Sequence, residues 1–474
     1  MKEQGKPSVF IPTLYFAEGL PYTIVMMMSG VFFKSMGADN VFIGLTSFLS
    51  LPWILKFAWS PLVDYYATKR RWIVVAQIVL ALFTLAMGGV ALLSSANGLG
   101  HVTKIAIISL SFIALASATQ DVAIDGYYLD VLNEEQKAFY VGIRNTAYKI
   151  AWLFGSGAMV FLAGKLAMTT SMGVGWAAAF GICAASMLAA GIFHSVYLPN
   201  PERKISPVQS ADEPVLAKRK GPDFLRSIGT YFVQPQIVAI VIYILIFRLG
   251  DALMLKQAPN FLLDPVSKGG LGISVADIGI INGTVGVIAL LLGGIVGSWL
   301  ISQQGLKRWM WPLALMQNSA ILLYWALARW PQALAVHGSF ATHWSVAGVA
   351  NPYLPAVYVV NSIEQFSYGL GVAAYTVFLL STVRSGENKA AHYATATAMM
   401  ALGMMLPGVL SGFLYNALGY ANFFLVSFIA SLPGIFAIFF LPLWRPESNA
   451  AVAVSGGGQA VGISQAGQVG SESK

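Results

Sequence analysis

The chain has 474 residues, of which 57% are hydrophobic and only 10% are charged, whereas an ordinary globular domain carries about 25% charged residues. This composition excludes a soluble globular protein and indicates a membrane protein with several spans. The formal net charge of +8 would favour nucleic acid as the partner of a soluble protein. Here we assign it to loops between spans, and we predict no nucleic-acid partner. The single cysteine, Cys183, excludes an intrachain disulfide.

Apolar runs long enough to cross a bilayer, about 20 residues each, form two groups of six. A charged, proline-rich stretch that no bilayer core would accept separates the groups and is predicted to be a linker. The end of the chain is rich in glycine, serine and glutamine and is predicted to be a disordered tail. The expected domains are a first lobe 1–198, a linker 199–235, a second lobe 236–444 and a tail 445–474. The expected spans are 9–33, 40–63, 72–95, 104–128, 138–162, 174–198, 236–262, 277–301, 309–330, 354–381, 391–417 and 421–443, with a longer loop at 331–353.

The distribution of basic residues predicts the orientation of the chain. An even number of spans puts both termini on one side, and the loops of that side hold eighteen Lys and Arg residues against five on the other side. The positive-inside rule then places both termini and the linker in the cytosol.

The two groups of spans resemble each other. The loop SPLVDYYATKRRW follows the second span and GSWLISQQGLKRW follows the eighth, and each closes on two basic residues and a tryptophan. Glu18 in FAEGLP and Asp251 in RLGDAL lie at matching depths in spans 1 and 7. Such duplication is typical of a two-lobed transporter, so we predict an all-α integral membrane protein with twelve helices in two six-helix lobes.

Three aspartates stand close together at the end of the fourth span, in ATQDVAIDGYYLD at 118–130. Asp121 and Asp125 are four residues apart and share a helix face, with Tyr128 nearly in line. Asp130 points elsewhere and lies at the cytosolic end, where water can solvate it. The first two are therefore the candidate functional carboxylates.

Basic residues of the fifth span are the expected partners of these carboxylates. Because span 5 runs antiparallel to span 4, counting inward from the loop places Arg144 level with Asp125 and Lys149 level with Asp121. An isolated charge at mid-membrane costs about 2.5–3.5 kcal/mol, so such charges pair or face a water-filled cavity. We predict both ion pairs. Each pair can either lock spans 4 and 5 together or take part in proton coupling, and both interpretations stay open. For Asp121, which lies deeper in the membrane, we favour the functional role.

A second candidate site lies on spans 7 and 10. Arg248 and Asp251 are three residues apart on one face, and Glu364 lies at a similar depth. Arg248 is the natural group to meet a carboxylate of the cargo, and Asp251 or Glu364 would hold it when the site is empty. A permanent brace between the two spans is the competing interpretation.

Several further polar residues lie within spans. Glu18 and Lys56 have comparable depths and are expected to form a structural pair, and Lys256 is expected to extend to the interface. Aromatic rings and amides that can stack on a sugar or hydrogen-bond it are Tyr22, Tyr127, Tyr128, Tyr375, Gln120 and Gln365.

Signatures of catalysis are missing from the sequence. It contains no G-x-x-x-x-G-K-[ST] loop for phosphate and no H-E-x-x-H or C-x-x-C for a metal. We therefore predict no enzyme, no metal and no cofactor. Transport would draw on an ion gradient.

Five motifs resemble the muropeptide permeases, the AmpG family of the major facilitator superfamily. They are GLPYT at 19–23, LKFAWSPLVD at 55–64, ATQDVAIDGYYLDVL at 118–132, RLGDAL at 248–253 and EQFSYGLGVAAY at 364–375. The resemblance covers all twelve spans and implies the major facilitator fold. It also implies import of anhydromuropeptides with protons across the bacterial inner membrane, for cell-wall recycling. A monomer embedded in the bilayer is the expected state.

The resemblance also assigns roles to residues. It carries Lys56, Asp64, Asp121, Asp125, Asp251 and Glu364 onto this chain, whereas Glu18, Lys149 and Arg248 depart from the family pattern. It further implies that the motif 60–71 packs near the lobe boundary, with Asp64 accepting hydrogen bonds. Together with the analysis of the spans, the expected substrate contacts are Gln120, Tyr128, Arg248, Asp251, Glu364 and Gln365. The expected proton-coupling acids are Glu18, Asp121, Asp125 and Glu364, and the structural or gating charges are Lys56, Asp64, Arg144 and Lys149.

Other functions stay open. Acetyl-CoA transporters share parts of the pattern, so the cargo can be acetyl-CoA, an oligosaccharide or another solute. A membrane receptor that kept the fold without transport is a different class, but such a receptor is expected to carry an appended soluble domain. An intramembrane enzyme is the remaining alternative. Charges that face a central cavity favour transport.

Overall fold

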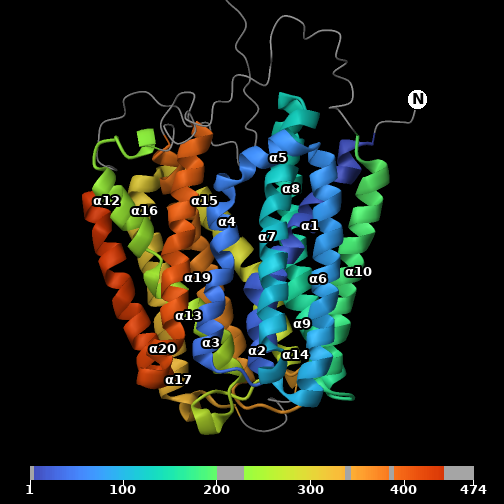
Figure 1. Ribbon diagram of the computed structural model, residues 1–474. Coiled ribbons are helices and arrows are strands. Elements are labelled where there is room, and N and C mark those ends of the chain that lie inside the picture. Colours follow the sequence, from blue (N-terminus) through green and yellow to red (C-terminus); the bar gives the residue numbers. More distant parts are fainter. Residues whose placement is uncertain (1–4, 200–228, 337–342, 384–388, 442–474) are drawn as a thin grey trace, which may run out of the picture.

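A computed structural model describes residues 5–199, 229–336, 343–383 and 389–441 of the chain. Within these ranges every regular element is a helix (Figure 1). Most of the predicted linker and all of the predicted tail lie outside these ranges. Part of the 331–353 loop and the side chain of Asp64 also lie outside the described part of the chain. The all-α prediction is confirmed for the described residues.

The first half of the chain forms six helical runs, several of them broken by π-helical or 3₁₀ turns. Short π segments inside α-helices mark local irregularities that are frequent at functional sites. The runs are α1 (Pro7–Thr23), η1 (Ile24–Met28) and α2 (Ser29–Ser35); α3 (Asn40–Leu45), η2 (Thr46–Ser50), α4 (Leu51–Leu55), η3 (Lys56–Ala58) and α5 (Ser60–Tyr66); α6 (Lys69–Asn97); α7 (Leu99–Val131); α8 (Glu134–Trp152), η4 (Leu153–Met159) and α9 (Val160–Ala167); and α10 (Met172–Tyr197).

The second half follows the same plan. Its elements are α12 (Ile237–Ile246) and α13 (Leu249–Leu263); η8 (Val266–Lys268); α14 (Val275–Ile280), η9 (Ile281–Gly286) and α15 (Val287–Gln304); α16 (Leu306–Ser319) and α17 (Ile321–Arg329); η10 (Pro331–Leu334); α19 (Leu354–Ser381); and α20 (Lys389–Ala437) with η11 (Ile438–Phe440).

Ten helices of the described chain are long and apolar enough to cross a membrane, against twelve predicted spans. Two causes account for the difference. The predicted span 309–330 is divided between α16 and α17, which are short helices when taken singly. The predicted spans 391–417 and 421–443 fall largely in the single element α20, in which Gly419 has a non-helical backbone with φ 70° and ψ 169°. A positive φ favours glycine, and the chain changes direction there.

The helices run up and down between two faces of the bundle (Figure 1). We call the face at which α1 begins the N face and the other the opposite face. The two halves of the chain meet near the opposite face, where α3 packs on α20 and α9 packs on α14. A Cβ at Gly412 would lie 2.2 Å from the carbonyl oxygen of Asn40, and one at Gly164 would lie 2.2 Å from the nitrogen of Ala276. Small residues of this kind allow helix backbones in membranes to touch.

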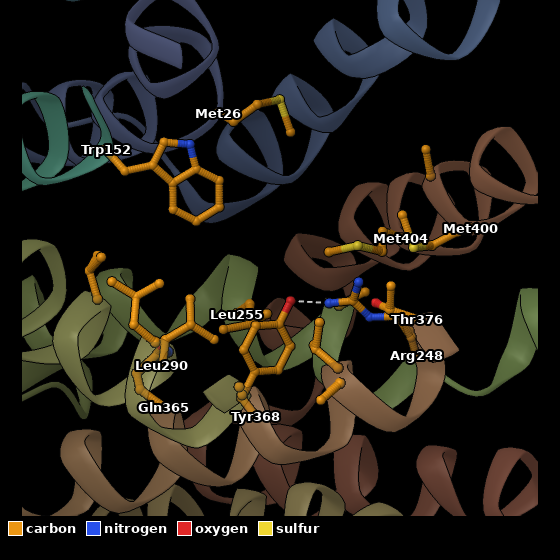
Figure 2. Close-up of a pocket in the computed structure, with 18 of the residues that line it drawn as sticks. Met26, Trp152, Arg248, Leu255, Leu290, Gln365, Tyr368, Thr376, Met400 and Met404 are labelled. Atoms are coloured by element: carbon orange, nitrogen blue, oxygen red, sulfur yellow. Dashed lines mark hydrogen bonds between the residues drawn. The ribbon is translucent and has the colours of Figure 1, made fainter. Parts of the chain in front are cut away.

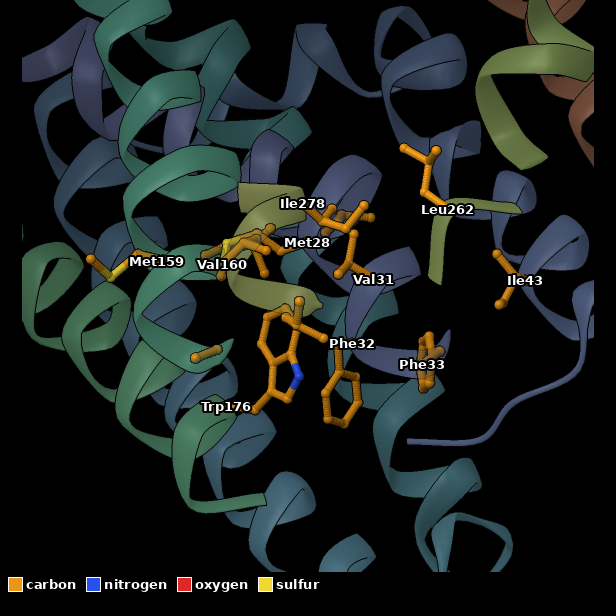
Figure 3. Packing of buried hydrophobic residues seen from close by; sticks show 14 of the residues in the cluster. Met28, Val31, Phe32, Phe33, Ile43, Met159, Val160, Trp176, Leu262 and Ile278 are labelled. Atoms are coloured by element: carbon orange, nitrogen blue, oxygen red, sulfur yellow. The ribbon is translucent and has the colours of Figure 1, made fainter. Parts of the chain in front are cut away.

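An apolar core continues across this contact. Met28, Val31 and Phe32 of the first half belong to the same buried cluster as Leu262 and Ile278 of the second half (Figure 3). Trp176 packs edge-on against Phe32 and donates its indole hydrogen to Ser35 at 2.8 Å. The opposite face is therefore closed by packed side chains from both halves.

A buried polar network, which we call the Asp264 network, ties the halves together at the same face. Lys34 donates to Asp264 at 2.7 Å and to Asn40 at 2.5 Å. Tyr420 donates to Asp264 at 2.5 Å and accepts from Asn40 at 2.9 Å. Two residues of the first half thus share their hydrogen bonds with two residues of the second.

Candidate functional site

A cavity of about 3110 Å³ lies between the two halves, well above the volume of roughly 300–1,000 Å³ that is usual for small-molecule pockets. Gln234 and Lys307, near the N-face ends of their helices, form part of its wall. Gly30 and Asn260 line it deeper in the bundle, on the side of the Asp264 network. The cavity therefore reaches toward the N face and is closed at the opposite face.

The wall formed by the first half is aromatic and carries one cation. Tyr22 stacks on Trp152 with ring centroids 6.1 Å apart and 3° between the planes, and it meets Trp53 edge-on at 5.1 Å. The ammonium of Lys149 lies 3.7 Å from the centroid of the Trp152 ring. Lys149 and Trp152 are one helical turn apart at the end of α8, which brings both to the cavity.

The wall formed by the second half carries Arg248 and Tyr368 (Figure 2). Arg248 stands at the break between α12 and α13 and is 4% exposed. Its guanidinium donates a hydrogen bond to the hydroxyl of Tyr368 and lies 5.1 Å from the centroid of that ring. Its Nε has no partner among the described residues. Arg248 thus keeps donor capacity that this structure leaves unused.

Of the predicted trio on spans 7 and 10, two residues line the cavity and one lies behind it. Glu364 lines the cavity, and one of its carboxylate oxygens accepts from Gln365 at 2.8 Å. Asp251 is 2% exposed and accepts from Gln317, and it is an electrostatic neighbour of Glu364. Neither carboxylate forms an ion pair with Arg248 within the described chain. Tyr368 holds the arginine instead.

A second polar cluster lies within the first half. Arg144 and Asp125 approach at 3.5 Å, as predicted. Tyr15 of α1 donates to Asp125 at 3.0 Å and accepts from Arg144 at 3.0 Å. Arg144 also lies 5.2 Å from the ring centroid of Tyr128.

The predicted pair between Asp121 and Lys149 is wrong. Asp121 forms its ion pair with Lys56, so the expected pair between Glu18 and Lys56 is not formed either. Glu18 is buried and has Asp121, Asp125 and Lys56 as its electrostatic neighbours. The cause is the position of α1, which packs against both α7 and α8. Matching depth on α7 and α8 alone therefore does not decide which side chains pair, since it holds for Asp125 with Arg144 but fails for Asp121 with Lys149.

Two predicted substrate contacts lie away from the cavity. Gln120 is buried and donates to the backbone carbonyl of Ala17 at 2.8 Å, and Tyr128 donates to the carbonyl of Lys137. Gln365 does line the cavity. At the N face, Lys69 and Asp130 form an ion pair between α6 and α7, so Asp130 is partnered as well as partly exposed.

Sequence reasoning missed Trp152 and Tyr368, although a spacing rule could have found them. Trp152 follows Lys149 by three residues and Tyr368 follows Glu364 by four, so each shares a helix face with a charge already singled out. Lys256 also lines the cavity, and its ammonium donates to the hydroxyl of Thr46 at 2.8 Å rather than extending to the interface.

Exchanging Asp125 and Arg144 tests whether this pair only holds helices together. Each single change of the exchange, Asp125→Arg or Arg144→Asp, places two like charges side by side at partly exposed positions, and like charges destabilise each other. We expect the single changes to lower the yield of folded protein and the double exchange to restore it without restoring transport. Size-exclusion profiles of solubilised protein and vesicle uptake are the measurements.

The exchange of Lys69 and Asp130 is the matched control for that experiment. This pair also involves α7 but lies at the N face, so its exchange should leave both yield and uptake unchanged. Recovery of uptake together with yield in the Asp125 and Arg144 exchange would remove Asp125 from proton coupling.

Comparison with known proteins places this arrangement in a family. The Major Facilitator Superfamily model matches residues 13–379. The fold is similar to that of the nucleoside transporter NupG, with a TM-score of 0.61, 16% identity and coverage of 92% of this chain and 98% of the other. A D-xylose–proton symporter gives a TM-score of 0.63 with 13% identity, covering 91% of this chain and 97% of the other.

Curated relatives are similar over most of their length. The anhydromuropeptide permease of Escherichia coli (strain K12) is 25% identical over 440 residues, which cover 91% of this chain and 79% of that protein. A putative transporter, AmpG 4, of Rickettsia conorii is 24% identical over 435 residues, covering 89% of this chain and 93% of the relative. The resemblance predicted from the five motifs is confirmed by these relatives.

Proposed function

The chain belongs to the Major Facilitator Superfamily, and we propose that it imports anhydromuropeptides in symport with protons. It is a transporter rather than an enzyme, and a multi-pass protein of a bacterial inner membrane. The similarity to the Escherichia coli anhydromuropeptide permease over 91% of this chain supports the choice of cargo.

The observation that carries the proposal is the chemistry of the two cavity walls. A muropeptide offers sugar hydroxyls, amides and carboxylates. The stacked rings of Tyr22 and Trp152 offer a flat surface for a sugar. The guanidinium of Arg248 lines the cavity without an ion pair to a described residue, and a guanidinium is well suited to bind a carboxylate. The large cavity accommodates a cargo that presents both groups at once.

The orientation of the chain in this proposal follows from the charge asymmetry of the loops. Lys69, Lys137 and Lys307 lie at the N face, which the positive-inside rule assigns to the cytosol. The cavity then faces the cytosol, and the closed opposite face is periplasmic. The structure corresponds to the state from which an importer releases its cargo.

In this proposal Glu364 is the proton-coupling acid. Its carboxylate lines the cavity and forms no ion pair with any described residue. A charge in a membrane span is kept where it pairs or meets water, and a proton is an alternative way to neutralise it. Arg248 and Glu364 then give one wall of the cavity a cargo contact and a proton site.

Uptake of a radiolabelled anhydromuropeptide into right-side-out membrane vesicles tests the proposed function. We expect uptake above that of vesicles without the protein, and stimulation by a pH gradient that is acidic outside. Excess unlabelled acetyl-CoA and an unrelated oligosaccharide should not compete. Competition by either compound, or uptake equal to that of empty vesicles, would contradict the proposed cargo.

A further inference from the structure

Lys149 is left without a carboxylate by the way the first half packs. Its predicted partner, Asp121, is bound to Lys56. Lys149 itself lines the central cavity and forms no ion pair with any residue that the structure describes. The ammonium instead lies over the face of Trp152, 3.7 Å from the ring centroid. The cavity thus holds a cation whose counter-charge is not supplied by the described protein.

A cation in this position is costly unless the cavity supplies an anion. Ionisable residues within spans pair with one another or mark the path of a substrate. The ring of Trp152 attracts the ammonium, but a ring face carries only a partial negative charge and is a weaker partner than a carboxylate. Trp152 is itself fixed by its stack on Tyr22. The ring therefore positions Lys149 without neutralising it.

A second such cation lies on the other wall. Arg248 has no ion pair with a described carboxylate and has one donor unused. Tyr22 of the first half is an electrostatic neighbour of Tyr368 and Arg248 of the second half, so the two walls approach each other beside these groups. Lys149 of the first half and Arg248 of the second half thus both line the cavity without an ion pair to a described carboxylate.

We propose that Lys149 binds a second carboxylate of the cargo, in addition to the one bound by Arg248. The substrate class is then a sugar-peptide with two free carboxylates, with its sugar beside the Tyr22–Trp152 stack. This inference rests on the proposed function and deepens it. A cargo bound in this way joins the two halves of the transporter, because each half contributes one of the cations.

Three cargo probes test the inference: a sugar-peptide with two free carboxylates, and the two monoamides in which one or the other carboxylate is an amide. We expect wild-type protein to take up the diacid about tenfold or more better than either monoamide, the loss expected for one charge-assisted hydrogen bond. Lys149→Gln should take up the diacid no better than one of the monoamides. Lys149→Arg should retain the preference for the diacid.

Lys256→Gln is the matched control. Lys256 lines the same cavity, but its ammonium donates to Thr46 of the first half, so this variant should keep the preference for the diacid. Equal uptake of the three probes by wild-type protein, or a preference for the diacid over both monoamides that persists in Lys149→Gln, would overturn the inference and leave the proposed function standing. Uptake of none of the probes by wild-type protein would overturn both.

Discussion

Replacing Glu364 by glutamine should leave the yield of folded protein unchanged and abolish the response of muropeptide uptake to a pH gradient. The side chain is 3% exposed and lines the cavity, and its carboxylate accepts from Gln365 at 2.8 Å. Glutamine has the same shape and keeps an oxygen acceptor for that hydrogen bond. The substitution therefore removes the proposed proton-exchanging group with little change in packing.

The size of the effect follows from the energy of a proton gradient. One pH unit is worth about 1.36 kcal/mol per proton, which is tenfold in an equilibrium constant. With the membrane potential clamped, a one-proton symporter can therefore accumulate cargo up to about tenfold per pH unit. We expect wild-type vesicles to approach this ratio and Glu364→Gln vesicles to stop near equal concentrations. Exchange of labelled for unlabelled cargo should persist in the variant.

Asp251→Asn is the control for Glu364→Gln. Asp251 lies behind the cavity wall and accepts from Gln317, and asparagine keeps an acceptor oxygen there, so we expect its amide variant to keep gradient-driven accumulation. Accumulation by Glu364→Gln at the wild-type ratio, with normal expression, would remove Glu364 from the coupling mechanism.

The spans of this protein can be predicted from the sequence because bilayer thickness fixes the length of an apolar helix. The run 354–381 is predicted as a span, and α19 occupies Leu354–Ser381. The predicted spans 391–417 and 421–443 leave a gap at 418–420, and the structure breaks the helix at Gly419 within that gap. Such features depend on local composition, which a single sequence contains.

The pairing of charges could be predicted only in part, because it depends on which helices are neighbours. Depth along the bilayer can be counted from a loop, and it correctly joined Asp125 to Arg144. The same count of depth failed for Asp121. Helix α1 packs against both α7 and α8, and Lys56 of the second span forms the ion pair with the Asp121 carboxylate. Lys149 thereby moves from an expected ion pair to the cavity wall.

The contact between the two halves was not predictable from composition. The chain has 47 glycines, and nothing in the sequence distinguishes Gly164 or Gly412, which allow close backbone contact, from glycines that face open space. The Asp264 network joins residues as distant as Asn40 and Tyr420, and no periodic pattern connects them. Its role is open to a direct test.

Replacing Asp264 by alanine should open the opposite face of the transporter. Asp264 accepts from Lys34 at 2.7 Å and from Tyr420 at 2.5 Å, and the side chains of Lys34 and Asp264 are 9% and 7% exposed. Removing one partner of a buried ion pair costs about 3–5 kcal/mol, because the other charge stays buried without compensation. The penalty applies to the closed state, since opening would let water reach Lys34. The substitution therefore shifts the equilibrium toward opening at this face.

Labelling of a cysteine inside the cavity measures this shift. We choose Met27→Cys, because Met27 lines the cavity, in a Cys183→Ala background that removes the native buried thiol. A membrane-impermeant maleimide is added from the opposite face. With a penalty of about 3 kcal/mol, labelling should be accelerated by about 100-fold if opening limits the reaction. Loss of gradient-driven uptake should accompany the faster labelling.

Asp39→Asn is the control that shows whether loss of any negative charge at this face accelerates labelling, or only loss of Asp264. Asp39 lies in the same region but caps α3, accepting from the backbone nitrogen of Phe42 at 2.7 Å. Asparagine is an equally good cap, so labelling of the introduced thiol in this control should match that of the parent Met27→Cys protein. Equal labelling rates in Asp264→Ala and the parent would show that the network does not hold the face closed. Faster labelling only in Asp264→Ala would identify the Asp264 network as the contact that holds this face closed and that must break when the face opens.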